Sequence, residues 1–115
     1  MPESDVQVYL RVRPSDDAAP GLSPTGPTSV VAGHGKSAQE YTFDRVFGAN
    51  TAQTAVFDAI GKDMTSACLE GFNTTIFAYG QTGAGKTYTV VGGEDGDTEG
   101  LIPRVLRDLF AMIAR

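Results

Sequence analysis

The stretch Gly80-Gln81-Thr82-Gly83-Ala84-Gly85-Lys86-Thr87 matches the pattern G-x-x-x-x-G-K-[ST] of a phosphate-binding loop. Residues 74–79, which precede it, are mostly β-branched or aromatic and too few for a helix, so they predict a buried strand. A helix is predicted directly after the loop. This order of strand, glycine loop and helix is the context that the pattern requires, and it predicts a layered α/β fold.

The residue types of this loop suit a phosphate-rich ligand. Glycines let the backbone curl so that successive N–H groups point inward, at the start of a helix whose dipole favours an anion. Lys86 supplies a compact positive charge for the β- and γ-phosphates, and the Thr87 hydroxyl is placed to bind Mg²⁺. A dinucleotide-binding loop does not fit, because residues 83–88 lack its third glycine. The alternative is a glycine-rich turn whose lysine is merely solvated.

Upstream of the loop, the sequence predicts extended structure first. Apolar and polar residues alternate over 6–13, which indicates a strand with one apolar face, and Pro14 cannot continue that strand. Residues 15–39 predict a variable surface loop, since Ser, Asp, Ala, Pro, Gly and Thr dominate its first half. Extended pieces at 29–32 and 40–43 could form a small hairpin that turns at the glycines between them.

A long helix is predicted from about 52 to 70. Asn50 or Thr51 could cap it, with Gln53 completing a capping box. Gly71 stands where a left-handed residue commonly ends a helix, while a glycine inside the helix, at 61, costs about 1 kcal/mol relative to alanine. The apolar residues expected to face the core recur at helical spacing: Val56, Phe57, Ile60, Met64, Ala67 and Cys68.

Downstream of the loop, the predicted helix is interrupted by a glycine-rich acidic loop at 92–100 and resumes near Ile102. The resumed helix is expected to place one apolar face on the core, made of Val105, Leu106, Leu109, Phe110 and Ile113. The acidic residues at 94–97 lack the spacing of a calcium-binding EF-hand loop, so we interpret them as a solvated charge run.

The composition excludes several classes of protein. With 9 Lys+Arg against 14 Asp+Glu, the net charge of −5 disfavours non-specific binding to nucleic acid or anionic lipid. A single cysteine excludes an intrachain disulfide and favours a reducing compartment. The N-terminal tail at 1–5 is acidic, unlike a secretory signal, and no apolar run suggests membrane insertion.

Several segments around the loop resemble the kinesin motor domain and occur in that family's order. They are RVRP at 11–14, YTFDRVF at 41–47, Gln53 with Val56-Phe57, GFNTTIFAYGQTGAGKTYT at 71–89 and GLIPR at 100–104. Together they are far more specific than a bare phosphate-binding motif. The resemblance leaves out only the loop at 15–39.

The resemblance implies that residues 1–115 form the N-terminal portion of a kinesin motor domain, a P-loop NTPase fold with a central β-sheet flanked by helices. Its ligands would be ATP or ADP with Mg²⁺. Arg11 and Pro14 would flank the adenine, and Tyr88 would lay its ring against the base. From residue chemistry alone, Arg11 could instead lie on a solvated strand face, and Tyr88 could be an ordinary packed aromatic.

The resemblance also implies an intact protein that couples ATP hydrolysis to movement along microtubules, in the cytoplasm and on the cytoskeleton. The kinesin switch motifs N-x-x-S-S-R-S-H and D-L-A-G-S-E do not occur in this sequence, so we expect no catalytic residue here and nucleotide binding at most. Met1 suggests a natural start, whereas Arg115 ends a helical pattern without a stop signal, which predicts further chain downstream. One alternative is a non-motor nucleotide-binding or interaction module; another is a small P-loop kinase or GTPase.

Overall fold

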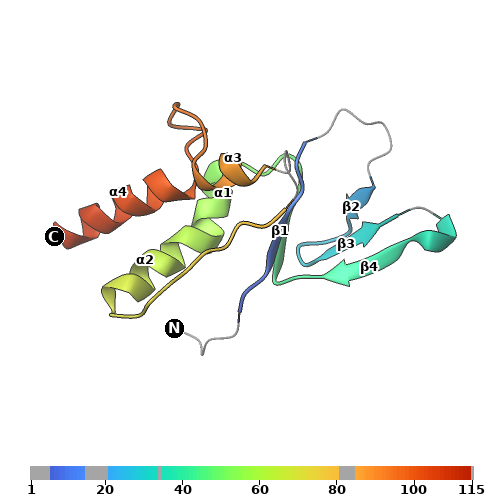
Figure 1. Cartoon of the computed structure of the whole chain (residues 1–115), viewed down its shortest axis with the longest axis horizontal. Coiled ribbons are helices and arrows are strands. Elements are labelled where there is room, and N and C mark those ends of the chain that lie inside the picture. Colours follow the sequence, from blue (N-terminus) through green and yellow to red (C-terminus); the bar gives the residue numbers. More distant parts are fainter. Residues whose placement is uncertain (1–5, 15–20, 34, 81–84, 115) are drawn as a thin grey trace. The chain divides into compact units, whose positions relative to one another are not determined.

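The computed structural model describes residues 6–14, 21–33, 35–80 and 85–114. The predicted N-terminal tail at 1–5 lies outside them, as does the first part of the predicted surface loop. The chain divides into two compact units, an N-terminal unit up to Thr51 and a C-terminal unit from Ala52 onward. Figure 1 shows that the strands belong to the first unit and the helices labelled α1 to α4 to the second.

The N-terminal unit contains a two-stranded parallel sheet of β1 (Tyr9–Arg11) and β5 (Arg45–Phe47), with Tyr9 opposite Arg45. The predicted strand at 6–13 is therefore present but shorter. Phe47 is buried, and its ring stacks on that of Tyr9 with 6.1 Å between the centroids. Val46, the preceding residue of β5, is buried as well, so side chains on both faces of this strand contribute to the small core of the sheet.

A second, antiparallel sheet joins β2 (Leu22–Pro24), β3 (Ser29–Ala32) and β4 (Gln39–Thr42) in that order. The pairing of β3 with β4 forms the hairpin expected from the sequence. The strand β2 differs from the expectation, because the sequence predicts a loop for its segment. It is exposed along its whole length and forms an edge, where a proline without an N–H is tolerated.

In the C-terminal unit, α1 (Gln53–Val56), a π-helical turn η2 (Phe57–Gly61) and α2 (Lys62–Leu69) follow one another without a break. This confirms the long helix predicted at 52–70, and Gly71 follows it with a left-handed φ of 99°. The predicted capping box is wrong. The N-cap residue is Ala52, and the buried Gln53 side chain bonds to other segments.

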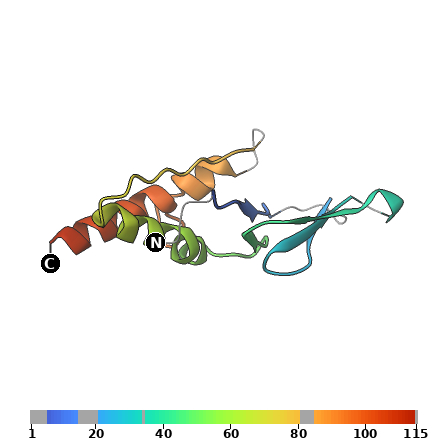
Figure 2. The same ribbon diagram turned by 90° about the horizontal axis from the view of Figure 1, so that it is seen from below.

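The remaining helices are α3 (Lys86–Val90) and α4 (Leu101–Ile113), and Figure 2 shows them from a second direction. The helix α4 packs against η2 and α2, and Val56, Ala67 and Leu101 are buried in the core of the unit. The prediction of one apolar core face on α4 is wrong in part. Val105 and Leu109 are half-buried, whereas the residues exposed on this helix include Ile102, Leu106, Phe110 and Ile113. Cys68, expected in the core, is also exposed.

The buried strand predicted at 74–79 is absent. These residues lead from the end of α2 back to the glycine loop without strand pairing, and Figure 1 draws them without an arrow. Phe77 is 90% exposed and Tyr79 is 99% exposed. A strand requires a hydrogen-bonded neighbour, and the two described sheets are formed by other segments. Strand-like residue types are therefore present without the partner that would make them a strand.

The glycine at 61 has a packing reason that the sequence did not reveal. A Cβ atom added there would lie 2.7 Å from Cε1 of Phe57 and 3.2 Å from Cγ2 of Val105. Because glycine has no side chain, η2 and α4 can pack closely against each other at this point. This close packing reverses the usual expectation that replacing a helical glycine is stabilising.

We expect Gly61→Ala to lower the free energy of unfolding by about 1 kcal/mol, because overpacking outweighs the gain in helix propensity. Urea unfolding followed by circular dichroism measures the change. Ser66→Ala, on an exposed position of α2, is the control and should be neutral or slightly stabilising. An increase of about 1 kcal/mol for Gly61→Ala would contradict the packing argument.

None of the helices within the described ranges combines the length and the apolar character needed to cross a membrane.

Candidate functional site

The structure describes only the two ends of the glycine loop. Gly80 lies before the gap, and Gln81, Thr82, Gly83 and Ala84 lie outside the described residues. After the gap, Gly85 has a left-handed φ of 103° and caps α3. A residue with a side chain would be strained in that conformation, so the glycine is what permits the sharp turn into the helix. Lys86 and Thr87 are then the first two residues of α3.

The side chains that open α3 differ in exposure. Lys86 is half-buried and Thr87 is exposed, while the ring of Tyr88 is 46% exposed. These three residues follow one another in the first turn of α3. The short helix is also held at its far end, because the Thr87 carbonyl accepts hydrogen bonds from Val91 N–H at 2.8 Å and Gly92 N–H at 3.0 Å.

Gln53 is a buried neighbour of this turn that the sequence did not identify as part of the site. Its Nε2 donates to the backbone carbonyl of Tyr88 at 2.7 Å and to that of Thr98 at 3.0 Å. The side chain therefore joins the start of α1 to α3 and to the loop that follows α3. The sequence did contain one indication that Gln53 is buried: it lies three residues before Val56 and therefore on the same, buried face of the helix.

The segment between α3 and α4 is a closed turn tied to α4. Gly92 pairs with Glu99, and the Gly100 N–H donates to the Val91 carbonyl at 3.0 Å. Arg104 donates to three carbonyls of the turn, from Nε to Glu99 at 2.7 Å and from Nη2 to Gly96 at 2.8 Å and to Asp97 at 3.3 Å. These bonds connect the C-terminal end of α3 to the first turn of α4.

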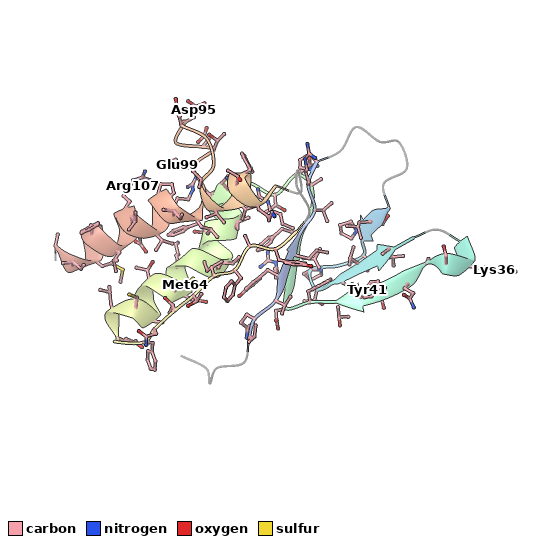
Figure 3. The ribbon with its side chains drawn as sticks, viewed as in Figure 1. Lys36, Tyr41, Met64, Asp95, Glu99 and Arg107 are labelled. Atoms are coloured by element: carbon pink, nitrogen blue, oxygen red, sulfur yellow. The ribbon has the colours of Figure 1, made fainter. Side chains whose placement is uncertain are left out.

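An ion pair adds to this connection. One guanidinium nitrogen of Arg107 lies 2.6 Å and 2.8 Å from the two carboxylate oxygens of Glu99. Figure 3 shows Arg107 on α4 with Glu99 beside it and Asp95 near the end of the turn. Because the Arg107 side chain is 64% exposed, this ion pair contributes little to stability by itself. The hydrogen bonds from Arg104 to backbone carbonyls contribute more to holding the turn against α4.

Two predicted site residues belong to the N-terminal unit. Arg11, at the end of β1, donates from Nη2 to the Thr51 carbonyl at 3.2 Å, and Pro14 is exposed three residues later. Tyr88 belongs to the C-terminal unit. The adenine contacts assigned to these three residues therefore remain predictions.

Lys86 and Thr87 at the start of a helix, after a left-handed glycine in a mixed α/β chain, are the arrangement of a P-loop NTPase. Residues 22–115 match the family described as "Kinesin motor domain". The chain belongs to the kinesin motor domain family.

Curated relatives agree with this assignment. The chain is 43% identical to kinesin-like protein KIF15 of Strongylocentrotus purpuratus, over 96% of this chain and 8% of the relative. It is 38% identical to kinesin-like protein Klp61F of Drosophila melanogaster, over 92% of this chain and 12% of the relative. The chain thus spans about a tenth of the length of these relatives.

A solved structure supports the fold. The chain matches the structure described as that of "a fast kinesin" with a TM-score of 0.87 and 34% identity, over 96% of this chain and 34% of the solved chain. The α/β class and the kinesin resemblance inferred from the sequence are confirmed. The chain is part of a kinesin motor domain.

Proposed function

We propose that this chain supplies the phosphate-binding half of an ATP site in a microtubule-based motor. The observation that carries the proposal is the left-handed Gly85 followed by Lys86 and Thr87 at the start of α3, in a chain of the kinesin family. The matched fast kinesin is described with reference to an ATPase mechanism and to interactions with microtubules. By this analogy the whole protein would hydrolyse ATP while moving on microtubules, in the cytoplasm and on the cytoskeleton.

Each site residue has a role in this proposal. Residues 80–87 hold the phosphates through backbone N–H groups, and Lys86 adds a positive charge at the β- and γ-phosphates. The Thr87 hydroxyl is one ligand of Mg²⁺, and water molecules and phosphate oxygens are the other ligands. The ring of Tyr88, with Arg11 and Pro14, contacts the adenine of ATP or ADP.

A titration of the whole chain with a fluorescent ATP analogue tests the proposal. We expect saturable binding that is stronger with Mg²⁺ and that unlabelled ATP and ADP displace. GTP should compete less well than ATP if the adenine contacts are correct. Failure of the folded chain to bind any of these nucleotides would overturn the proposal, and preference for GTP would overturn the adenine assignment.

The Mg²⁺ role of Thr87 has its own test. We expect Thr87→Val to weaken binding of Mg²⁺·ATP about tenfold, since one metal ligand is lost, a change of about 1.4 kcal/mol. Binding of the analogue in EDTA should be unchanged. Thr54→Val, on an exposed position of α1, is the control and should bind like the wild type. An equal loss with and without Mg²⁺ would contradict a metal-binding role.

A further inference from the structure

Gln53 is one of two polar side chains that are buried in the described residues, with 3% of its surface exposed. It is the first residue of α1, and its amide reaches two segments far along the chain. The bonds from Nε2 to the carbonyls of Tyr88 and Thr98 are 2.7 Å and 3.0 Å long. Both hydrogens of one amide group thus meet backbone acceptors.

The bond to Tyr88 replaces one that a longer helix would provide. In a continuing α-helix, the Gly92 N–H would donate to the carbonyl four residues earlier, that of Tyr88. Here the Gly92 N–H donates to Thr87 instead, at 3.0 Å, as the helix ends. The amide of Gln53 supplies a donor to the Tyr88 carbonyl at the point where the regular helical pattern stops.

The bond to Thr98 reaches the other side of the turn. The Thr98 carbonyl also accepts the Gly93 N–H at 2.9 Å, so Gln53 bonds to the paired backbone that closes the turn. A helix as short as α3 is not stable alone and takes its position from such tertiary contacts. Through these two bonds, Gln53 ties α3 and the turn to α1.

We propose that Gln53 is a positioning residue for the nucleotide site. It holds the backbone of Tyr88, next to Thr87, and thereby fixes where the phosphate and adenine contacts of α3 are presented. Gln53 acts through this backbone and not through contact with the nucleotide. The inference rests on the proposed function and adds to it a residue outside the phosphate-binding motif.

Two substitutions in the whole chain test the inference. Gln53→Met keeps a similar length without donors, and Gln53→Glu keeps the shape but places a carboxylate against two carbonyl oxygens. We expect about tenfold weaker binding of a fluorescent ATP analogue with Mg²⁺ for Gln53→Met, and at least as great a loss for Gln53→Glu. Amide hydrogen exchange at Val91 and Gly92 should be faster in both variants without nucleotide.

Thr65→Val is the matched control. Thr65 is the other buried polar residue in the part of the chain that the structure describes. Its hydroxyl donates to the Gly61 carbonyl at 3.0 Å, so it lies in the same unit as Gln53, but its bond stays within the continuous helix of η2 and α2. All variants should lose stability, so affinity is measured at a temperature where circular dichroism shows each of them to be folded. An equal loss of affinity in Thr65→Val would show general loosening and overturn the positioning role.

The remaining outcomes separate the two proposals. A wild-type chain that binds no nucleotide overturns the proposed function, whereas wild-type binding with unchanged affinity in folded Gln53→Met overturns only the inference. If neither Gln53 variant folds, NMR of the wild type decides. The side-chain amide signals of Gln53 should then shift during titration with Mg²⁺·ATP, with the affinity seen by fluorescence, and invariant signals would overturn the positioning role.

Discussion

Lys86→Ala is expected to weaken binding of Mg²⁺·ATP by about thirtyfold or more. The half-buried Lys86 is the first residue of α3, directly after the left-handed glycine, so its position is set by the backbone. A hydrogen bond to a charged group contributes about 2 kcal/mol, which corresponds to roughly thirtyfold in the dissociation constant. Titration of the variant chain with the fluorescent ATP analogue measures the loss.

A second lysine provides the matched control for charge. Lys62, at the start of α2, pairs with Asp58 at 3.1 Å, and its side chain is 60% exposed. Lys62→Ala removes the same charge from the same unit at an exposed position, where such pairs contribute little. We expect it to bind nucleotide like the wild type. Equal effects of the two substitutions would show that Lys86 acts through net charge and not through contact with phosphate.

Gly92→Ala is expected to lower the free energy of unfolding of the C-terminal unit by about 3 kcal/mol. The φ angle of Gly92 is 76°, a conformation that costs a residue with a side chain about 1 kcal/mol or more. An added Cβ would also overlap the Thr98 oxygen and the Gly100 nitrogen and lie 2.7 Å from the Glu99 carbonyl carbon. These are backbone atoms, so the turn itself would have to open. Urea unfolding measures the loss.

The same turn contains the control. A Cβ added at Gly96 would meet no atom within 4 Å, and Gly96 has no positive φ. We expect Gly96→Ala to change the free energy of unfolding by at most about 0.5 kcal/mol. If Gly92→Ala were equally neutral, the closed turn between α3 and α4 would not be what fixes the two helices.

The features that the sequence predicted well depend on local signals. The helix at 52–70 has apolar residues at helical spacing and a glycine where the chain turns left-handed, and both signals lie within a few residues of what they specify. The hairpin of β3 and β4 likewise has its turn glycines between its strands. The start of α3 follows from the motif, because only a glycine accepts the conformation at position 85 without strain.

The features that the sequence did not predict depend on distant partners. Residues 74–79 have strand-like side chains, but a strand forms only where a neighbour pairs with it, and the local sequence does not show that neighbour. Gln53 looked like a helix cap because capping is a local role, whereas its partners lie 35 and 45 residues away. The exposed face of α4 was misassigned for a related reason: periodicity identifies an apolar face without showing what packs on it.

Because Cys68 is exposed, its thiol can be labelled selectively. It is the only cysteine in the sequence and lies near the end of α2, away in sequence from the glycine loop. A thiol-reactive fluorophore attached there would label the C-terminal unit at one defined place without any further substitution. Its emission would report unfolding of that unit during the comparisons at Gly61 and Gly92, while the residues assigned to nucleotide binding stay unmodified.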